Sequence, residues 1–226
     1  PAAIGPPLAP AAAVRRTMPF NSLQYALFLP VVVLLHWALP RRWRTPLLLV
    51  ASYVFYGSWA WRFALLLALV STVDWAVARA IGASDEPRRR RRLLAVSVVV
   101  DLGVLAYFKY AGFFVEEVTS VLDRLGLVAD PVLVEVLLPV GISFYTFQSM
   151  SYTIDLYRGE AARARNLVDF ACYVTLYPQL IAGPIVRYGE TEEQLRERTH
   201  SVSKFADGVE FFIRGLAKKI LLADTA

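Results

Sequence analysis

Hydrophobic residues in the first half of the chain gather into long runs separated by arginines. The first run has no charged residue from Thr17 to Pro40, and three further runs of similar character follow. A helix needs about 20 mostly apolar residues to cross a hydrocarbon core of about 30 Å. The pattern predicts membrane-spanning helices at about residues 23–39, 45–61, 63–78 and 93–108.

The next uncharged segment, from Val136 to Ile154, is rich in hydrogen-bonding side chains. These are Ser143, Tyr145, Thr146, Gln148, Ser149, Ser151, Tyr152 and Thr153. A lipid-facing helix has no use for so many polar groups, whereas a helix that faces other helices or a wet cavity does. We therefore expect an inward-facing helix here.

A third kind of segment runs from Phe170 to Val186, which is uncharged but contains Pro178, Gly183 and Pro184. These residues cannot all lie in one regular helix without freeing backbone groups. Irregular backbone at membrane depth is tolerated only where it is buried in protein or lines a cavity. The sequence predicts a broken or re-entrant segment at the edge of a functional chamber.

The C-terminal part reads as a polar stretch, Glu190 to His200, followed by an amphipathic helix at about 203–224. The helix would carry one apolar face, made of Phe205, Val209, Phe212, Ile213, Leu216 and Ile220. Such a helix lies in the membrane interface or packs on the chamber from the cytoplasmic side. The basic residues of this helix could bind either the phosphate groups of a coenzyme or anionic lipid headgroups, and both interpretations stay open. These residues are Arg214, Lys218 and Lys219.

Composition supports an integral membrane protein. Hydrophobic residues make up 57% of the 226 residues and charged residues 19%, and the mean hydropathy is +0.47. A soluble domain is closer to 45–50% apolar and about 25% charged. The domain organisation that follows is a flexible N-terminal extension at 1–17, with a natural start at Met18, and one membrane domain at 18–226.

The net charge of +5 is not spread evenly. It is concentrated between apolar runs, at Arg41, Arg42 and Arg44 and again at Arg79 and 88–92, where five arginines follow one another. Basic loops stay in the cytoplasm, so this distribution predicts a multi-pass protein with its N-terminus outside. The same position between spans argues against a nucleic-acid patch.

Histidine and cysteine are too few for several kinds of chemistry. A lone Cys172 excludes an intrachain disulfide and a four-cysteine metal site, and we interpret it as a small buried hydrophobe. His36 and His200 are the only histidines, which excludes a histidine-rich metal centre. We expect His36 to be a packing or interfacial residue and His200 to be structural or peripheral.

Two aspartates, Asp74 and Asp101, interrupt predicted spans. A carboxylate at membrane depth costs about 3 kcal/mol on insertion scales, so such residues raise the hypothesis of a proton relay or an ion site. The preferred interpretation is simpler. Each is expected near the end of its span, or paired with an arginine or a backbone donor.

Several motifs resemble the membrane-bound O-acyltransferase family, and in particular its alginate O-acetylation branch. They are spread over 18–226 and include residues 138–145, 147–149, 151–152, 155–159, 165–166, 169–170, 178–184, 187, 198–200 and 218–224. Further matches are 18–22, 52–53, 55–56 and 107–110.

The resemblance implies an all-α, polytopic transmembrane bundle around a funnel through a thinned membrane. Members move an acyl group from a cytoplasmic donor to an acceptor hydroxyl. For this branch the resemblance implies acetyl-CoA as donor with no bound cofactor or metal, a polysaccharide acceptor, an extracytoplasmic partner protein and the bacterial inner membrane. It also places the acid–base histidine beyond Ala226, so this chain would lack it.

The matching positions give the candidate site residues. On the polar helix we expect Gln148, Tyr152 and Asp155 to line the channel. In the broken segment the candidates that shape the channel and position the donor are Pro178, Gln179, Gly183, Pro184 and Arg187. None is expected to act as acid or base.

Other functions remain open on the residues alone. A transporter or channel subunit also has broken helices and intramembrane polar groups, but it would repeat the broken segment, and only one is evident. A non-catalytic membrane scaffold is the second alternative. Among enzymes, D-alanyl transfer to a cell-wall polymer or lipid acylation is the third.

Overall fold

A computed structural model describes residues 18–125, 137–181, 183–196, 199 and 201–223, and the regular structure of these residues is helical throughout. The expected N-terminal extension, residue 136, His200 and Asp224 lie outside the described residues. The elements are α1 (Leu23–Ala38), α2 (Arg41–Gly82), α3 (Pro87–Arg124), α4 (Ile142–Arg158), α5 (Leu167–Thr175), α6 (Tyr177–Leu180), α7 (Tyr188–Arg196), α8 (Val202–Lys218) and a π-helical turn (Lys219–Ala223).

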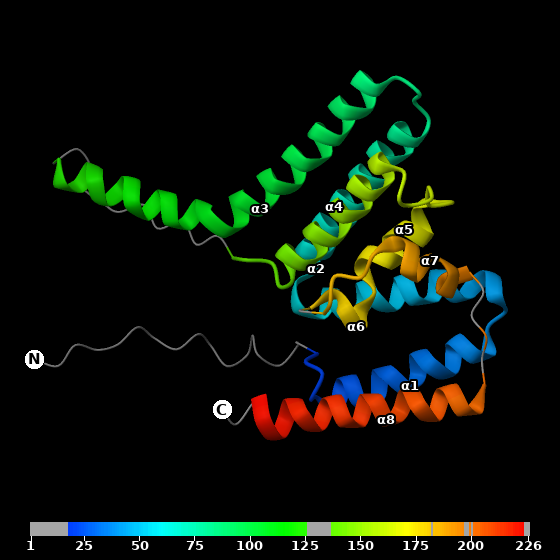
Figure 1. The fold of residues 1–226 in the computed structure, drawn as a ribbon. Helices are drawn as coiled ribbons and strands as arrows, with labels where there is room; N and C mark the ends of the chain where they lie inside the picture. The colour runs from blue at the N-terminus through cyan, green and yellow to red at the C-terminus, as the bar shows by residue number, and fades with distance from the viewer. Residues whose placement is uncertain (1–17, 126–136, 182, 197–198, 200, 224–226) are drawn as a thin grey trace, which may run out of the picture.

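The second and third predicted spans form one helix, α2, so the expected break at Arg62 is wrong. Arg62 is exposed, and arginine is a good helix former, so a charge on the outside does not end the helix. Figure 1 shows α2 as two arms at a clear angle to each other. The second arm contains the stretch Trp61–Gly82, which is long and apolar enough to cross a membrane.

The fourth predicted span is part of α3, which starts earlier and ends later than expected. Glu86 precedes its first residue and Pro87 occupies the first turn, where proline's missing N–H costs no hydrogen bond. The five arginines therefore belong to the helix and not to a loop, which corrects the prediction. Arg90 donates from Nη2 to the carbonyl oxygen of Tyr157, at 2.9 Å, and so ties α3 to the C-terminal end of α4.

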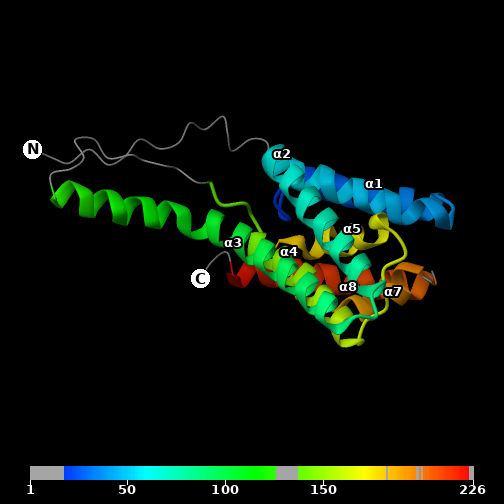
Figure 2. The same ribbon diagram turned by 90° about the horizontal axis from the view of Figure 1, so that it is seen from above.

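Within the part of the chain that the structure describes, two helical stretches, Trp61–Gly82 and Pro87–Arg124, satisfy the length and apolarity of a membrane span, and α1 is apolar but shorter. The second arm of α2, the first part of α3 and α4 pack side by side, while the rest of α3 projects away from the other helices (Figures 1 and 2). The exposed side chains of that projecting part include Phe113, Phe114 and Val118.

Helix α4 begins at Ile142, later than the predicted start near Val136. The preceding residues include Pro139, and Gly141 has φ +78°, a left-handed conformation that glycine adopts readily. The Tyr56 hydroxyl donates to the Val140 carbonyl oxygen at 2.9 Å, which fixes this non-helical entry against α2.

Aromatic side chains are the largest members of the buried core. One cluster joins α2, α4 and α5 through Tyr56, Tyr145, Tyr152, Phe170 and Tyr173, all almost fully buried. A second cluster joins α1, α2 and α6 through Tyr25, Phe55 and Tyr177. The break between α5 and α6 thus lies between two packed clusters.

The amphipathic C-terminal helix is confirmed as α8. Ser201 caps its N-terminus by accepting a hydrogen bond from the Lys204 amide at 3.1 Å. It lies alongside α1 in Figure 1.

Candidate functional site

The predicted break after α5 is present, and its freed backbone groups are paired by side chains. In a continuous helix the Tyr173 carbonyl would accept from the Tyr177 amide. Here the Tyr173 carbonyl instead accepts from Gln148 Nε2 at 2.8 Å and from Gln179 Nε2 at 3.1 Å. The Tyr177 amide donates to Ser52 Oγ at 3.1 Å. We call Ser52, Gln148, Tyr173 and Gln179 the tyrosine network.

Pro178 explains why the helix cannot continue. It has no N–H for the Val174 carbonyl and it occupies the first turn of α6, a position that proline tolerates. Only Leu176 separates α5 from α6. Proline therefore sets the place of the break, and the network compensates for it.

Gly183 is required by close packing of the backbone. A Cβ atom at this position would overlap the backbone of Gln179, whose carbonyl already accepts from the Gly183 amide at 3.0 Å. Any side chain at residue 183 would push the non-helical segment 183–187 away from α6. Pro184, the next residue, lies exposed in that extended stretch.

The extended stretch after Gly183 is also anchored from α5. The Tyr173 hydroxyl donates to the Val186 carbonyl oxygen at 2.8 Å. The Tyr188 ring packs edge-on against Tyr152 and Tyr173, with centroids 4.8 Å and 5.1 Å apart. The broken segment is thus held at both of its ends by aromatic residues of the core.

Three further predicted residues lie at the outer edge of this region. The Tyr152 hydroxyl accepts from the Ala164 amide at 2.9 Å, which holds the loop between α4 and α5. Arg187 Nε lies 4.0 Å from the mostly buried Asp155 carboxylate, and its Nη1 lies 3.5 Å from Glu160. Because the Arg187 side chain is 62% exposed, these are loose, water-screened ion pairs.

The structure therefore brings together Gln148, Tyr152, Asp155, Gln179 and Arg187 along one seam of α4, α5 and the chain after α6. Pro178, Gly183 and Pro184 shape the same segment. Gln148, Tyr152 and Gln179 bind backbone groups, whereas Asp155 and Arg187 contact each other as a loose ion pair. A role in lining a channel stays a prediction.

The predicted phosphate-binding residues lie on α8. Arg214 Nη2 pairs with Glu210 at 2.5 Å, so part of its charge is already neutralised. Lys218 is the last residue of α8 and Lys219 the first of the π-helical turn. Donor binding by these three residues stays a prediction.

Two residues that support the broken segment, Gly141 and Ser52, lie in motifs that resemble the family but were not predicted as site residues. A Cβ atom at Gly141 would lie 2.6 Å from the Leu180 carbonyl oxygen, in addition to its positive φ. The proline two residues before it was a usable signal for a non-helical entry. The role of Ser52 on α2 had no local signal, because its partner, Tyr177, lies far away in the sequence.

The two intramembrane aspartates correct the sequence interpretation. Both are completely buried, and neither pairs with an arginine in the described contacts. Asp74 of α2 accepts from Ser97 Oγ of α3 at 2.9 Å and from Ser149 Oγ of α4. Asp101 of α3, one turn after Ser97, is also completely buried, and its two carboxylate oxygens accept no hydrogen bond in the described contacts. We call Asp74, Ser97, Asp101 and Ser149 the aspartate cluster.

The reason for this error is that the partners come from three different helices. Periodicity within one helix cannot show which residues meet across helices. The spacing of Ser97 and Asp101, four residues apart, was the one available signal, because it places both on the same face of α3.

The remaining candidates behave as small or packing residues. Cys172 is completely buried, as predicted, and His36 is 8% exposed within α1. Among the residues that the structure describes, no group of three or more histidine, cysteine or acidic side chains could hold a metal ion.

Two apolar helical stretches of spanning length in the described residues and a proline-broken segment are typical of a helical membrane protein. Comparison with known proteins adds its relatives. The chain is 47% identical over 201 residues to the probable alginate O-acetylase AlgI of Pseudomonas aeruginosa, covering 88% of this chain and 38% of that protein. It is 45% identical to the corresponding protein of Azotobacter vinelandii, with 88% and 40% covered. The chain is therefore similar to alginate O-acetylases along most of its own length.

The name of a more distant relative indicates a different acceptor polymer, peptidoglycan. The chain is 27% identical over 233 residues to a peptidoglycan O-acetyltransferase of Helicobacter pylori, covering 87% of this chain and 42% of that protein. The chain thus spans about two fifths of the length of the curated relatives it matches. No family model and no solved structure matches the chain.

Proposed function

We propose that this chain is part of a membrane O-acetyltransferase that transfers acetyl groups from acetyl-CoA toward hydroxyl groups of an extracytoplasmic polysaccharide. The observation that carries the proposal is the 40–47% identity to alginate O-acetylases over 88% of the chain. The peptidoglycan enzyme among the relatives makes a cell-wall glycan the alternative acceptor.

The geometry supports a positioning role for the segment rather than an acid–base role. A thioester beside a hydroxyl reacts productively only where water is kept out, which requires a well-formed wall. The seam of α4, α5 and the chain after α6 would supply such a wall, and the pairing of its broken backbone by side chains supports this role. The acid–base histidine of the family belongs, in this proposal, to the part of the protein beyond Ala226.

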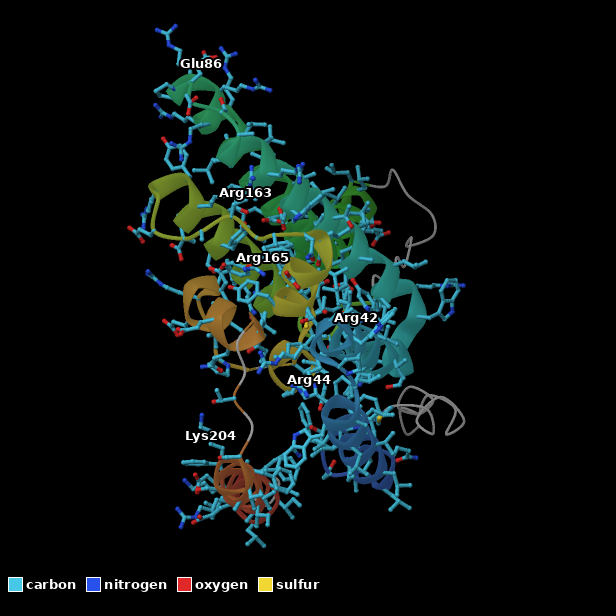
Figure 3. The ribbon with its side chains drawn as sticks, turned by 90° about the vertical axis from the view of Figure 1, so that its right-hand side faces the viewer. Arg42, Arg44, Glu86, Arg163, Arg165 and Lys204 are labelled. Atoms are coloured by element: carbon cyan, nitrogen blue, oxygen red, sulfur yellow. The ribbon has the colours of Figure 1, made fainter. Side chains whose placement is uncertain are left out.

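The proposal includes a multi-pass protein of the bacterial inner membrane with its N-terminus outside. Basic residues from separate segments support this orientation because they gather on one side of the molecule. In Figure 3, Arg42 and Arg44 of α2, Arg163 and Arg165 of the α4–α5 loop and Lys204 of α8 all lie on the face turned to the viewer. A cytoplasmic face is expected to carry such an excess.

The test is deletion of the full-length gene followed by analysis of the surface glycans. We expect the ester-linked acetyl content of the exported polysaccharide to fall and to be restored by the wild-type gene. Acetyl loss confined to peptidoglycan would move the acceptor to the cell wall. Unchanged acetyl content together with lost D-alanyl esters or lost lipid acylation would overturn the proposal.

A further inference from the structure

An apolar groove of about 580 Å³ lies between α1, α8 and the broken segment. Its walls include Leu29 and Val33 of α1, Pro178 of α6, and Phe205, Val209 and Phe212 of α8. Among the residues proposed for acyl transfer, only Pro178 lines this space, so the groove lies beside the seam and not within it.

Helix α8 is held beside α1 by aromatic rings at two points along the groove. The rings of Trp37 and Phe205 lie 5.0 Å apart, and those of Tyr25 and Phe212 lie 6.5 Å apart. Gly208 lies between these contacts on the same side of α8, and a Cβ atom there would meet no other atom within 4 Å. The groove is thus open at the middle of the helix pair.

One end of the groove is positively charged. Lys204 lines it, one turn before Gly208, and its Nζ donates to the Thr199 hydroxyl at 2.6 Å. Lys204 lies on the same basic face as Arg42 and Arg44 (Figure 3). An apolar channel with a cationic end is complementary to a molecule with one apolar chain and an anionic head.

The size of the groove suits a small molecule. Its volume of about 580 Å³ falls within the range of about 300 to 1,000 Å³ that is usual for small-molecule sites.

We propose that this groove binds one acyl chain of an anionic phospholipid, with the lipid phosphate at Lys204. The apolar side chain of Phe211 on α8 is exposed, and a helix with such a surface would give the ligand direct access from the bilayer. The lipid would take no part in the acyl-transfer reaction itself. It would add to the aromatic contacts that hold α8 against α1.

The experiment measures lipid retention by the purified full-length protein after exchange into vesicles of phosphatidylcholine containing phosphatidylglycerol, read by native mass spectrometry. Gly208→Leu adds a side chain on the groove side of α8, at a position where a Cβ atom meets nothing within 4 Å, and should abolish retention of phosphatidylglycerol. Gly215→Leu is the matched control, because Gly215 is also on α8, also meets nothing within 4 Å, and does not line the groove.

A second pair of variants tests the charged end. Lys204→Gln should weaken retention of phosphatidylglycerol about fivefold while leaving phosphatidylcholine unaffected, since one lysine near anionic headgroups contributes by about that factor. Lys109→Gln, which removes a lysine from α3, should leave retention unchanged.

Three results would overturn the proposal. Equal retention by Gly208→Leu and Gly215→Leu would show that the lipid binds elsewhere. Displacement of the lipid by coenzyme A would make the groove a donor site. If the Gly208→Cys variant crosslinks to another segment of the full-length protein and retains no lipid, then protein and not lipid fills the groove.

Discussion

The tyrosine network and the aspartate cluster are both buried in the same helical assembly, yet their side chains bind different kinds of group. In the tyrosine network, Gln148 and Gln179 bind a backbone carbonyl that the break after α5 leaves free. In the aspartate cluster, Asp74 binds hydroxyls of two intact helices. Polar residues in the first repair a broken backbone, whereas those in the second join regular helices to one another.

This difference decides which substitutions should be costly. Where polar side chains pair a broken backbone, a substitution that adds atoms beside that backbone should displace the whole segment. Where they join helices, a change removes one contact and leaves each helix intact. Stability of the purified full-length protein in detergent, measured by thermal or denaturant unfolding, separates the two cases.

The largest effect is expected from Gly183→Ala. Its Cβ atom would overlap the Gln179 backbone, so the chain after α6 must move, at a cost of about 3 kcal/mol. Gly103→Ala in α3 is the control, because a Cβ there meets nothing within 4 Å and alanine favours a helix by about 1 kcal/mol over glycine. Equal melting temperatures for the two variants would contradict the close packing at Gly183.

The next largest effect is expected from Asp74→Leu. It leaves the hydroxyls of Ser97 and Ser149 buried without their acceptor, and each such group costs about 1 to 3 kcal/mol. Asp101→Asn should cost less, because the amide it introduces can donate to Asp74. If Asp101→Asn proves the more destabilising of the two, Asp74 is not the centre of the cluster.

A double-mutant cycle on Gln148 and Gln179 gives a smaller but more specific effect. Each single change to leucine leaves the Tyr173 carbonyl with one donor and should cost about 1 kcal/mol. The double variant leaves the carbonyl with neither glutamine, so its cost should exceed the sum of the singles by about 0.5 to 3 kcal/mol. Additive costs would mean that the two glutamines do not share this acceptor.

The smallest effect is expected from Arg187→Gln. Its ion pairs with Asp155 and Glu160 are long and the side chain is exposed, so the stability change should stay within about 0.5 kcal/mol and vanish at high salt. A loss that persists in 1 M salt would show that Arg187 contributes more than a screened ion pair.

The same comparison explains what the sequence could predict. Pro178 and Gly183 act through their own backbone, so the break was visible without knowledge of any neighbour. The amphipathic face of α8 was visible for the same reason. The aspartate cluster was not, because Asp74 is buried by partners from α3 and α4 that no periodicity within α2 reveals.

Helix boundaries failed where a charge was taken as an interruption. Arg62 and residues 88–92 were expected to lie in loops, but arginine is compatible with a helix and the structure keeps all of them helical. A charged residue in the sequence indicates where a helix leaves an apolar environment. The backbone hydrogen bonds of the helix can continue beyond that residue.

The measurement that tests the account most directly is the acetyl ester content of the exported polysaccharide in a deletion strain that carries the Gln148→Leu, Gln179→Leu variant of the full-length gene. The account predicts that this variant accumulates in the membrane but restores little acetylation, while Gln194→Leu, an exposed change of the same kind on α7, restores it fully. Full acetylation by the double variant at an equal protein level would contradict the claim that this seam forms part of the acetyl-transfer site.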